Sequence, residues 1–106
     1  MPKYLLHGSY TLEGVKGLIK DGGSKRRAAF EQVVQGLGGT VEAYYFAFGK
    51  SDIYAITDLP DNVSAAAISL AVTASGVAHA GTTVLMTAEE MDRATKKSVS
   101  YTSPGG

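Results

Sequence analysis

Two largely apolar stretches lie in the middle of the chain, Val41–Phe48 and Ile53–Leu59, and the residues of each alternate between two faces. Successive side chains of a strand point to opposite faces, so this period of two predicts two β-strands. The residues between them, Gly49-Lys50-Ser51-Asp52, favour a turn, because glycine tolerates positive φ and Ser and Asp bond to local backbone. Pro60 ends the second strand, since proline cannot donate to a sheet ladder. We therefore expect a central β-hairpin.

Two further stretches have strand character, one near each end of the chain. Lys3–Thr11 alternates, with Tyr4, Leu6 and Tyr10 on one face and Leu5, His7 and Ser9 on the other. Val77–Thr87 is the second, and its strand pattern is clearest from Gly81 onward. With the hairpin, these stretches predict four strands.

The segment between the first strand and the hairpin has helical spacing in two pieces. Leu12–Lys20 is the first piece, and Asp21-Gly22-Gly23 interrupts it. Ser24 is the expected N-cap of the second piece. Its apolar residues fall at i, i+3, i+4 and i+7, which is one stripe of a helix: Phe30, Val33, Val34 and Leu37.

A further helix is predicted after the hairpin, from Asp61 or Asn62 to about Ser75, with Gly76 as its stop. We expect its buried stripe to contain Val63, Ala67, Leu70, Ala71 and Ala74, with Ile68 and Val72 extending it. Thr87 and Glu90 match a capping box and predict a last short helix. We expect one domain, residues 1–97, followed by a loose polar tail, residues 98–106.

The predicted order, strand, helix, strand, strand, helix, strand, helix, is an α+β arrangement called split βαβ. It places helices on one face of a four-stranded antiparallel sheet. Depending on register, the other face carries either Tyr4, Leu6, Tyr10 and Tyr45 or Leu5, Phe46, Phe48, Tyr54 and Ile56. Either set is too apolar for a solvated surface, so we expect a second copy to pack on it as a two-fold dimer.

The composition restricts the classes of function. Ten basic residues match ten acidic ones in 106 residues, and this zero net charge argues against binding nucleic acid through phosphate neutralisation. The absence of cysteine excludes disulfides, thiolate catalysis and Cys-based metal sites. Neither a signal peptide nor a membrane span is indicated, so the expected location is the cytoplasm.

Several segments together resemble the GYD domain family. They are the opening strand, Leu37-Gly38-Gly39-Thr40-Val41, the stretch Tyr45–Ile56, and Thr82-Thr83-Val84 with the Thr-Ala-Glu-Glu helix start. The family's hairpin turn reads Gly-Tyr-Asp, whereas Lys50 and Ser51 stand between Gly49 and Asp52 in this chain, in a turn that is one residue longer or differently aligned. The resemblance implies a ferredoxin-like fold of the dimeric α+β barrel group, which includes cofactor-free monooxygenases, isomerases and stress-response proteins. Fold analogy alone does not transfer those activities.

Two strand residues are candidate catalytic groups. His7 can act as a general base near neutral pH, although a single histidine on a half-buried strand is more often a hydrogen-bonded structural residue. Tyr10 is the other candidate, as a phenol donor. Four further residues are candidates for ligand binding: Tyr44, Tyr45, Tyr54 and Asp52. The tyrosines fit an aromatic pocket for a planar ligand or, alternatively, core and interface packing, and Asp52 fits either ligand orientation or the turn amides.

Other motifs carry less chemistry. Lys25, Arg26 and Arg27 begin a helix, where they form either a solvated basic surface or an anion site. His7 and His79 lack carboxylates at ligand spacing, so no metal site is predicted, and we expect His79 in an exposed loop.

Two functions remain open. One is a dimer that binds or turns over a small, partly aromatic molecule without a cofactor. The other is a non-catalytic module for oligomerisation or sensing.

Overall fold

The computed structural model describes residues 1–106 and contains four strands and four helices. In chain order they are β1 (Lys3–Tyr10), α1 (Leu12–Asp21), α2 (Gly23–Gly36), β2 (Thr40–Phe46), β3 (Ile53–Asp58), α3 (Asn62–Ala74), β4 (Ala78–Leu85) and α4 (Ala88–Thr95). This confirms the expected order, including the division of the first helical segment into two pieces.

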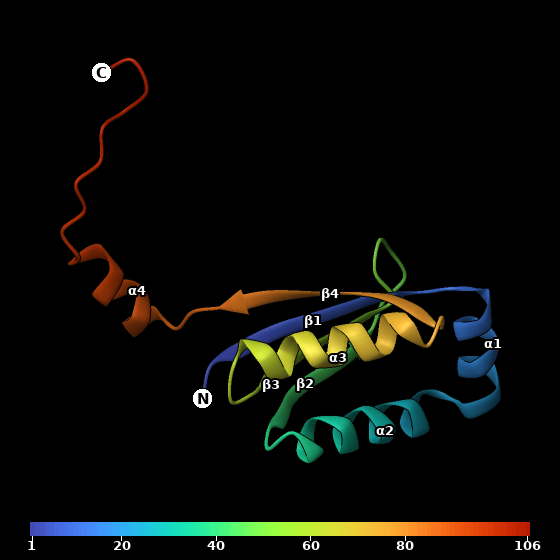
Figure 1. Cartoon of the computed structure of the whole chain (residues 1–106). Coiled ribbons are helices and arrows are strands. Elements are labelled where there is room, and N and C mark those ends of the chain that lie inside the picture. The colour runs from blue at the N-terminus through green and yellow to red at the C-terminus, as the bar shows by residue number, and fades with distance from the viewer.

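The four strands form one antiparallel sheet in the order β2-β3-β1-β4. This is the expected ferredoxin-like α+β arrangement. β1 occupies an inner position, paired with β3 on one side and β4 on the other. Figure 1 shows α2 and α3 on the same side of the sheet, where they form its only helical layer.

The core lies between the sheet and these two helices. Tyr4 and Leu6 of β1 point into it, and Val34 of α2 and Ile68 of α3 meet them. The side chain of Val34 is 0% exposed, in agreement with its place in the predicted stripe of α2. The hydroxyl of Tyr4 donates a hydrogen bond to Asn62 Oδ1 at 2.7 Å, which satisfies the one polar group of this buried ring.

Helix α3 presents a different face to the sheet from the one expected. Ala65 and Ile68 are buried, whereas Val63 is 77% exposed and Leu70 is 71% exposed. The predicted stripe was therefore wrong for Val63 and Leu70, whereas the two residues expected to extend it, Ile68 and Val72, do pack on the core. Apolar residues occur on every side of this helix, so their spacing does not identify the buried side.

Two boundaries also differ from expectation. Gly22, at φ +81°, ends α1 and precedes α2 directly, so Ser24 lies inside α2 and is not its N-cap. β2 ends at Phe46, and Ala47 and Phe48 belong to the loop that leads to β3. The N-caps expected for α3 and α4 are confirmed, including the capping box formed by Thr87 and Glu90.

The pairing of β2 with β3 shifts by one residue between Val41 and Ala43. Val41 is paired with Thr57, and Tyr44 is paired with Ala55. All four of these side chains lie on the helical side of the sheet, where Thr57 and Ala55 are buried. Glu42 is the extra residue of this β-bulge.

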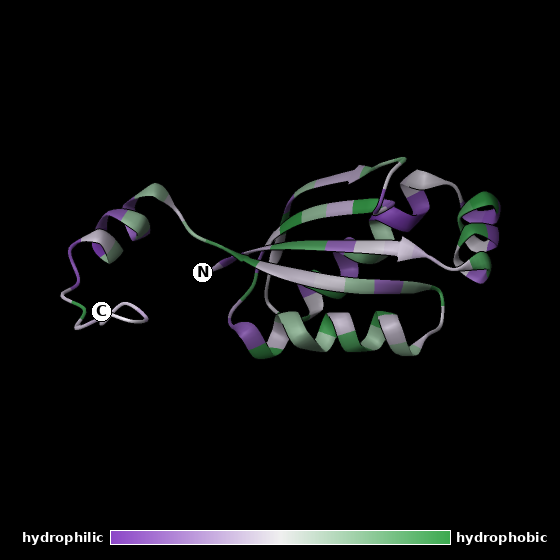
Figure 2. Ribbon diagram, turned by 90° about the horizontal axis from the view of Figure 1, so that it is seen from above, coloured by the Kyte–Doolittle hydropathy of each residue, from purple (hydrophilic) through white to green (hydrophobic).

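The side of the sheet away from α2 and α3 is called the open face here. Figure 2 looks onto it, and no helix lies in front of the strands. The open face matches neither of the two alternative sets of residues expected from the sequence. Tyr45, from the first set, lies beside Leu5, Tyr54 and Ile56 from the second, and Phe46 of the second set turns towards the helices. His79 is exposed as expected, but it lies in β4 and not in a loop.

Helix α4 and the residues after it extend beyond the end of the sheet (Figure 1). No residue of α4 is buried. Residues 98–106 contain neither helix nor strand.

Helix α1 lies close to the start of β4, and this approach depends on Gly14. The Thr11 amide donates to the Val77 carbonyl oxygen at 3.0 Å, and the Thr11 hydroxyl donates to the Gly76 carbonyl oxygen at 2.6 Å. A Cβ on Gly14 would collide with the Val77 carbonyl oxygen and lie 2.6 Å from Tyr10 Cδ1. A Cβ on Gly17 would meet nothing within 4 Å.

We expect Gly14→Ala to lower the free energy of unfolding by about 1–3 kcal/mol, because the added methyl group overpacks the contact with β4. Gly17→Ala is the matched control in the same helix. It should raise the free energy by about 1 kcal/mol, the ordinary difference in helix propensity. Urea denaturation of both variants at one protein concentration checks this. Equal effects of the two substitutions would contradict the close approach.

Candidate functional site

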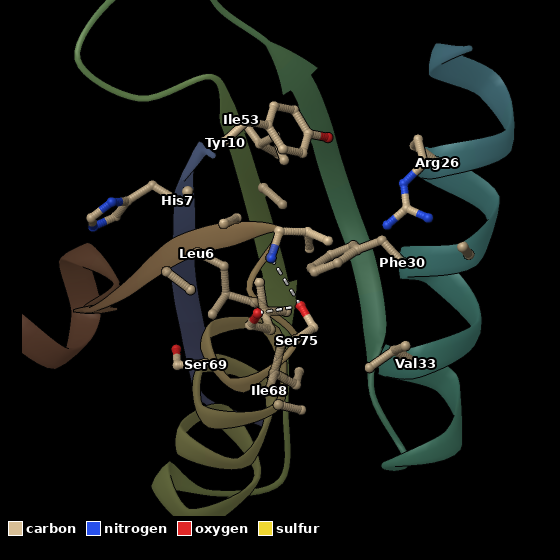
Figure 3. A pocket seen from close by; sticks show the side chains of 18 of the residues that line it. Leu6, His7, Tyr10, Arg26, Phe30, Val33, Ile53, Ile68, Ser69 and Ser75 are labelled. Atoms are coloured by element: carbon tan, nitrogen blue, oxygen red, sulfur yellow. Dashed lines mark hydrogen bonds between the residues drawn. The ribbon is translucent and has the colours of Figure 1, made fainter. Parts of the chain in front are cut away.

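A cavity of about 280 Å³ separates α2 from α3 on the helical side of the sheet. Most of its lining is apolar, with Phe30 and Val33 from α2, Ile68 from α3 and Leu6 and Ala55 from the strands. Figure 3 shows α2 on one side and α3 below, with the strands behind. Val33 is 48% exposed, so the cavity opens to solvent along α2. Its volume is close to the lower end of the range for small-molecule sites, about 300–1,000 Å³.

Arg26 is the only lysine, arginine or carboxylate side chain in this lining. It enters from the first part of α2 and points towards the space between α2 and the sheet (Figure 3). Its guanidinium has one charged partner, Asp21, at 3.6 Å between Nη1 and Oδ2. That distance exceeds an ordinary charge-assisted hydrogen bond. The guanidinium also donates to the Tyr10 hydroxyl, which uses only part of its five N–H donors.

Tyr10 closes the same end of the cavity from the last residue of β1. Its hydroxyl points towards Arg26 (Figure 3). Burial raises the pKa of this hydroxyl above its ordinary value, and the Arg26 guanidinium opposes the rise. The Tyr10 backbone amide donates to Asp52 Oδ2 at 2.8 Å, so Asp52 holds the end of β1 and does not line the cavity.

Tyr44 lies on β2 beside these two residues and is 7% exposed. Its ring packs against Phe30 and Phe46, with ring centroids 5.4 and 5.3 Å apart respectively. Burial raises the pKa of the Tyr44 hydroxyl to about 12, Tyr10 adds to the rise, and Arg26 opposes it. The hydroxyl is therefore neutral at physiological pH and available as a hydrogen-bond donor.

Two serine hydroxyls in the lining are already engaged by the protein. Ser69 Oγ lies 2.7 Å from Thr82 Oγ1, and the Ser75 hydroxyl donates to the Val72 carbonyl oxygen at 2.6 Å. The Tyr10 hydroxyl, in contrast, accepts from the Arg26 guanidinium, which leaves its own proton free, and the Tyr44 hydroxyl lies beside these two groups. The polar side chains that point into the cavity and keep free donors are thus Arg26 and two phenols, all at one end.

The remaining candidates lie on the open face. His7 is paired with Tyr54 of β3 and Gly81 of β4, and Tyr54 is paired with Tyr45 of β2. The imidazole lies over Gly81, where a Cβ would come within 2.6 Å of its Cε1. His7 is among the residues that line the cavity, but its imidazole points away from α2 and α3 (Figure 3), and its ring centroid is 6.3 Å from that of Tyr54.

The structure therefore divides the predicted site residues into two groups. Tyr10 and Tyr44 share the cavity, whereas His7, Tyr45 and Tyr54 form a row across the open face. The side chains of the two proposed catalytic residues, His7 and Tyr10, point to opposite sides of the sheet (Figure 3).

From the sequence, Lys25, Arg26 and Arg27 were treated alike, although the spacing along α2 distinguishes Arg26 from its two neighbours. It lies four residues before Phe30, so helical spacing aligns it with the apolar stripe of α2. Its neighbours form other ion pairs. Lys25 Nζ is 3.6 Å from Asp21 Oδ1, and Arg27 Nε is 3.4 Å from Glu31 Oε1.

No group of three or more His, Asp or Glu side chains is placed to hold a metal ion. None of the helices combines the length and the apolar character that crossing a membrane requires.

The raised pKa of Tyr44 predicts a loss of stability at high pH. An unfolded tyrosine ionises near pH 10, whereas the folded Tyr44 stays protonated to about pH 12. Its contribution is therefore intact below pH 10, and the free energy of unfolding falls as pH rises from 10 towards 12.

In Tyr44→Phe this fall should be smaller, as measured by urea denaturation at several pH values. Val33→Ala, which trims the same cavity wall without removing an ionisable group, should change the free energy equally at every pH. A profile in Tyr44→Phe parallel to that of the unaltered protein would contradict the burial of the phenol.

Comparisons with known proteins identify the family. The family model described as the GYD domain matches residues 4–95, which include every strand and helix except the first residue of β1. The search of curated proteins and the search of solved structures returned no match. The match covers most of the 106 residues, and the chain therefore belongs to the GYD domain family.

Proposed function

We propose that this protein is a small α+β dimer that binds a small, partly aromatic molecule in the cavity between α2, α3 and the sheet, without a cofactor. The observation that carries the proposal is the division of the cavity into a long apolar wall and one polar end. Such a combination buries an apolar ligand and fixes its orientation. Phe30 and Tyr44 supply aromatic surface to the wall.

Where the ligand is also turned over, Tyr10 is the side chain in position to exchange a proton with it. Its hydroxyl is in the cavity, where burial raises its pKa and the Arg26 guanidinium opposes that rise. His7 does not share this position, because its imidazole is on the open face. In a catalytic protein of this kind, His7 has a structural role within its own chain.

The dimer is proposed from the open face. An apolar row, Ala43, Ile56 and Leu5, crosses the strands next to the row formed by Tyr45, Tyr54 and His7. Tyr45 is 71% exposed. A continuous apolar and aromatic surface of this kind is typical of an interface, and a second copy covers it most simply through a two-fold axis.

A second candidate function is a non-catalytic module for oligomerisation or sensing. The observation that favours it is the separation of His7 from Tyr10, which leaves no catalytic pair within one chain. Further exposed apolar residues on α1, Leu12 and Ile19, also fit a protein whose role is association. Both candidates include the dimer, and only ligand binding separates them.

Filling the cavity tests ligand binding. We expect thermal-shift screening with one- and two-ring aromatic alcohols, acids and quinones to identify compounds that raise the midpoint of the unaltered protein. Saturation at 100 times the dissociation constant stabilises by about 2.7 kcal/mol, or roughly 10 °C for a domain of this size. Ala29→Trp places an indole in the lining and should abolish the shift.

Ala28→Trp is the matched control for Ala29→Trp, because Ala28 is exposed and lies outside the cavity lining. This variant should keep the shift. A screen without any stabilising compound for the unaltered protein would reject ligand binding and leave the association module.

A charge on the open face tests the dimer. Ile56→Lys should convert a dimer into a monomer at micromolar concentration, because it places an unpaired ammonium group within the apolar row. Multi-angle light scattering measures this. Ala28→Lys, on the exposed side of α2, should remain dimeric. A monomeric unaltered protein at that concentration would contradict the proposal.

A further inference from the structure

The polar end of the cavity carries a positive charge that no lining residue neutralises. Arg26 contributes a full positive charge, and no carboxylate lines the cavity to neutralise it. Asp21, its only charged partner, is 3.6 Å away and is shared with Lys25. A cation at the edge of an apolar cavity attracts an anionic ligand group more strongly than it would in open solvent, since the surroundings screen it less.

The donors at this end also match one kind of anion. A guanidinium presents parallel N–H groups that fit the two oxygens of a carboxylate. Tyr10 and Tyr44 add two hydroxyl donors, and burial, which raises the pKa of both, keeps their protons in place. Two phenols and one guanidinium supply donors for both carboxylate oxygens, with nothing on the protein competing for the phenol protons.

The rest of the cavity limits the size and charge of the ligand. A volume of about 280 Å³ with a mostly apolar lining suits one or two rings or a short branched chain. A single arginine neutralises one negative charge. A phosphate monoester would bring a second charge that no other cation in the lining balances.

We propose that the ligand of this cavity is an aromatic or similarly apolar monocarboxylate, whose carboxylate binds Arg26 and the hydroxyls of Tyr10 and Tyr44 while its ring lies against Phe30 and Val33. This inference rests on the proposed function, because it names the ligand class of the same cavity. Arg26 is the residue that makes the cavity prefer a carboxylic acid over a neutral ligand.

Titration calorimetry with matched probes tests the inference. The probes are benzoate and 2-naphthoate, the neutral amides of both acids, and 2-naphthyl phosphate. We expect the unaltered protein to bind at least one acid about ten times more tightly than its amide, and more tightly than the phosphate. Arg26→Gln should remove the preference for the acid while the amide binds as before.

Arg27→Gln is the matched control, because Arg27 is the next residue of α2, pairs with Glu31 and does not line the cavity. It should retain the tenfold preference. Tyr10→Phe should reduce the preference by a smaller factor, since it removes one donor and no charge. The comparison of acid with amide in the unaltered protein does not depend on the folding of any variant.

Each alternative result has a defined meaning. Equal binding of acid and amide by the unaltered protein would overturn the monocarboxylate assignment and leave the proposed ligand cavity standing. An equal loss of preference in Arg26→Gln and Arg27→Gln would overturn the role of Arg26, and tighter binding of the phosphate would overturn the carboxylate. Binding of none of the five probes would overturn the monocarboxylate assignment, whereas only an empty thermal-shift screen would reject the cavity as a ligand site.

Discussion

The fold depends on the pairing of β1, which is hydrogen-bonded to β3 on one side and to β4 on the other. Because side chains alternate along a strand, this pairing sends Tyr4, Leu6 and Tyr10 towards the helices and leaves Leu5 and His7 on the open face. A slip of one residue would exchange the core for the open face. The register of β1 thus determines both which residues line the cavity and which residues form the exposed apolar surface.

Local signals made the elements of the fold predictable. The hairpin follows from alternation on both sides of a turn, and the caps at Asp61 and Thr87 follow from side chains that bond to nearby amides. What the sequence left open is which side each element buries. α3 is apolar on every side, and β2 contains a bulge, so in both cases the periodicity does not identify the buried face.

The candidate site was predictable only in part, for the same reason. Tyr44 and Tyr45 are adjacent in the chain and look equivalent in the sequence, yet they belong to opposite sides of the sheet. Arg26 is one of three consecutive basic residues, and only the phase of α2 brings it, rather than its neighbours, to the cavity. Such assignments depend on tertiary packing, which a local pattern does not contain.

The extra residue in β2 has a consequence for how the strand tolerates changes in length. Val41 and Tyr44 are separated by an odd number of positions, so regular pleating would turn them to opposite sides, and Glu42 allows both to face the helices. Glu42 itself reaches Lys3 Nζ, 2.7 Å away, which is also bonded to Asp58 across the strands. Deleting one residue here would turn either Val41 or Tyr44 to the open face. The protein would then lose a core contact of Val41 or the aromatic ring of Tyr44 in the cavity wall. Insertions and deletions should therefore be tolerated at Phe48 and Gly49, the exposed tip of the loop after β2, and strongly selected against within β2 itself.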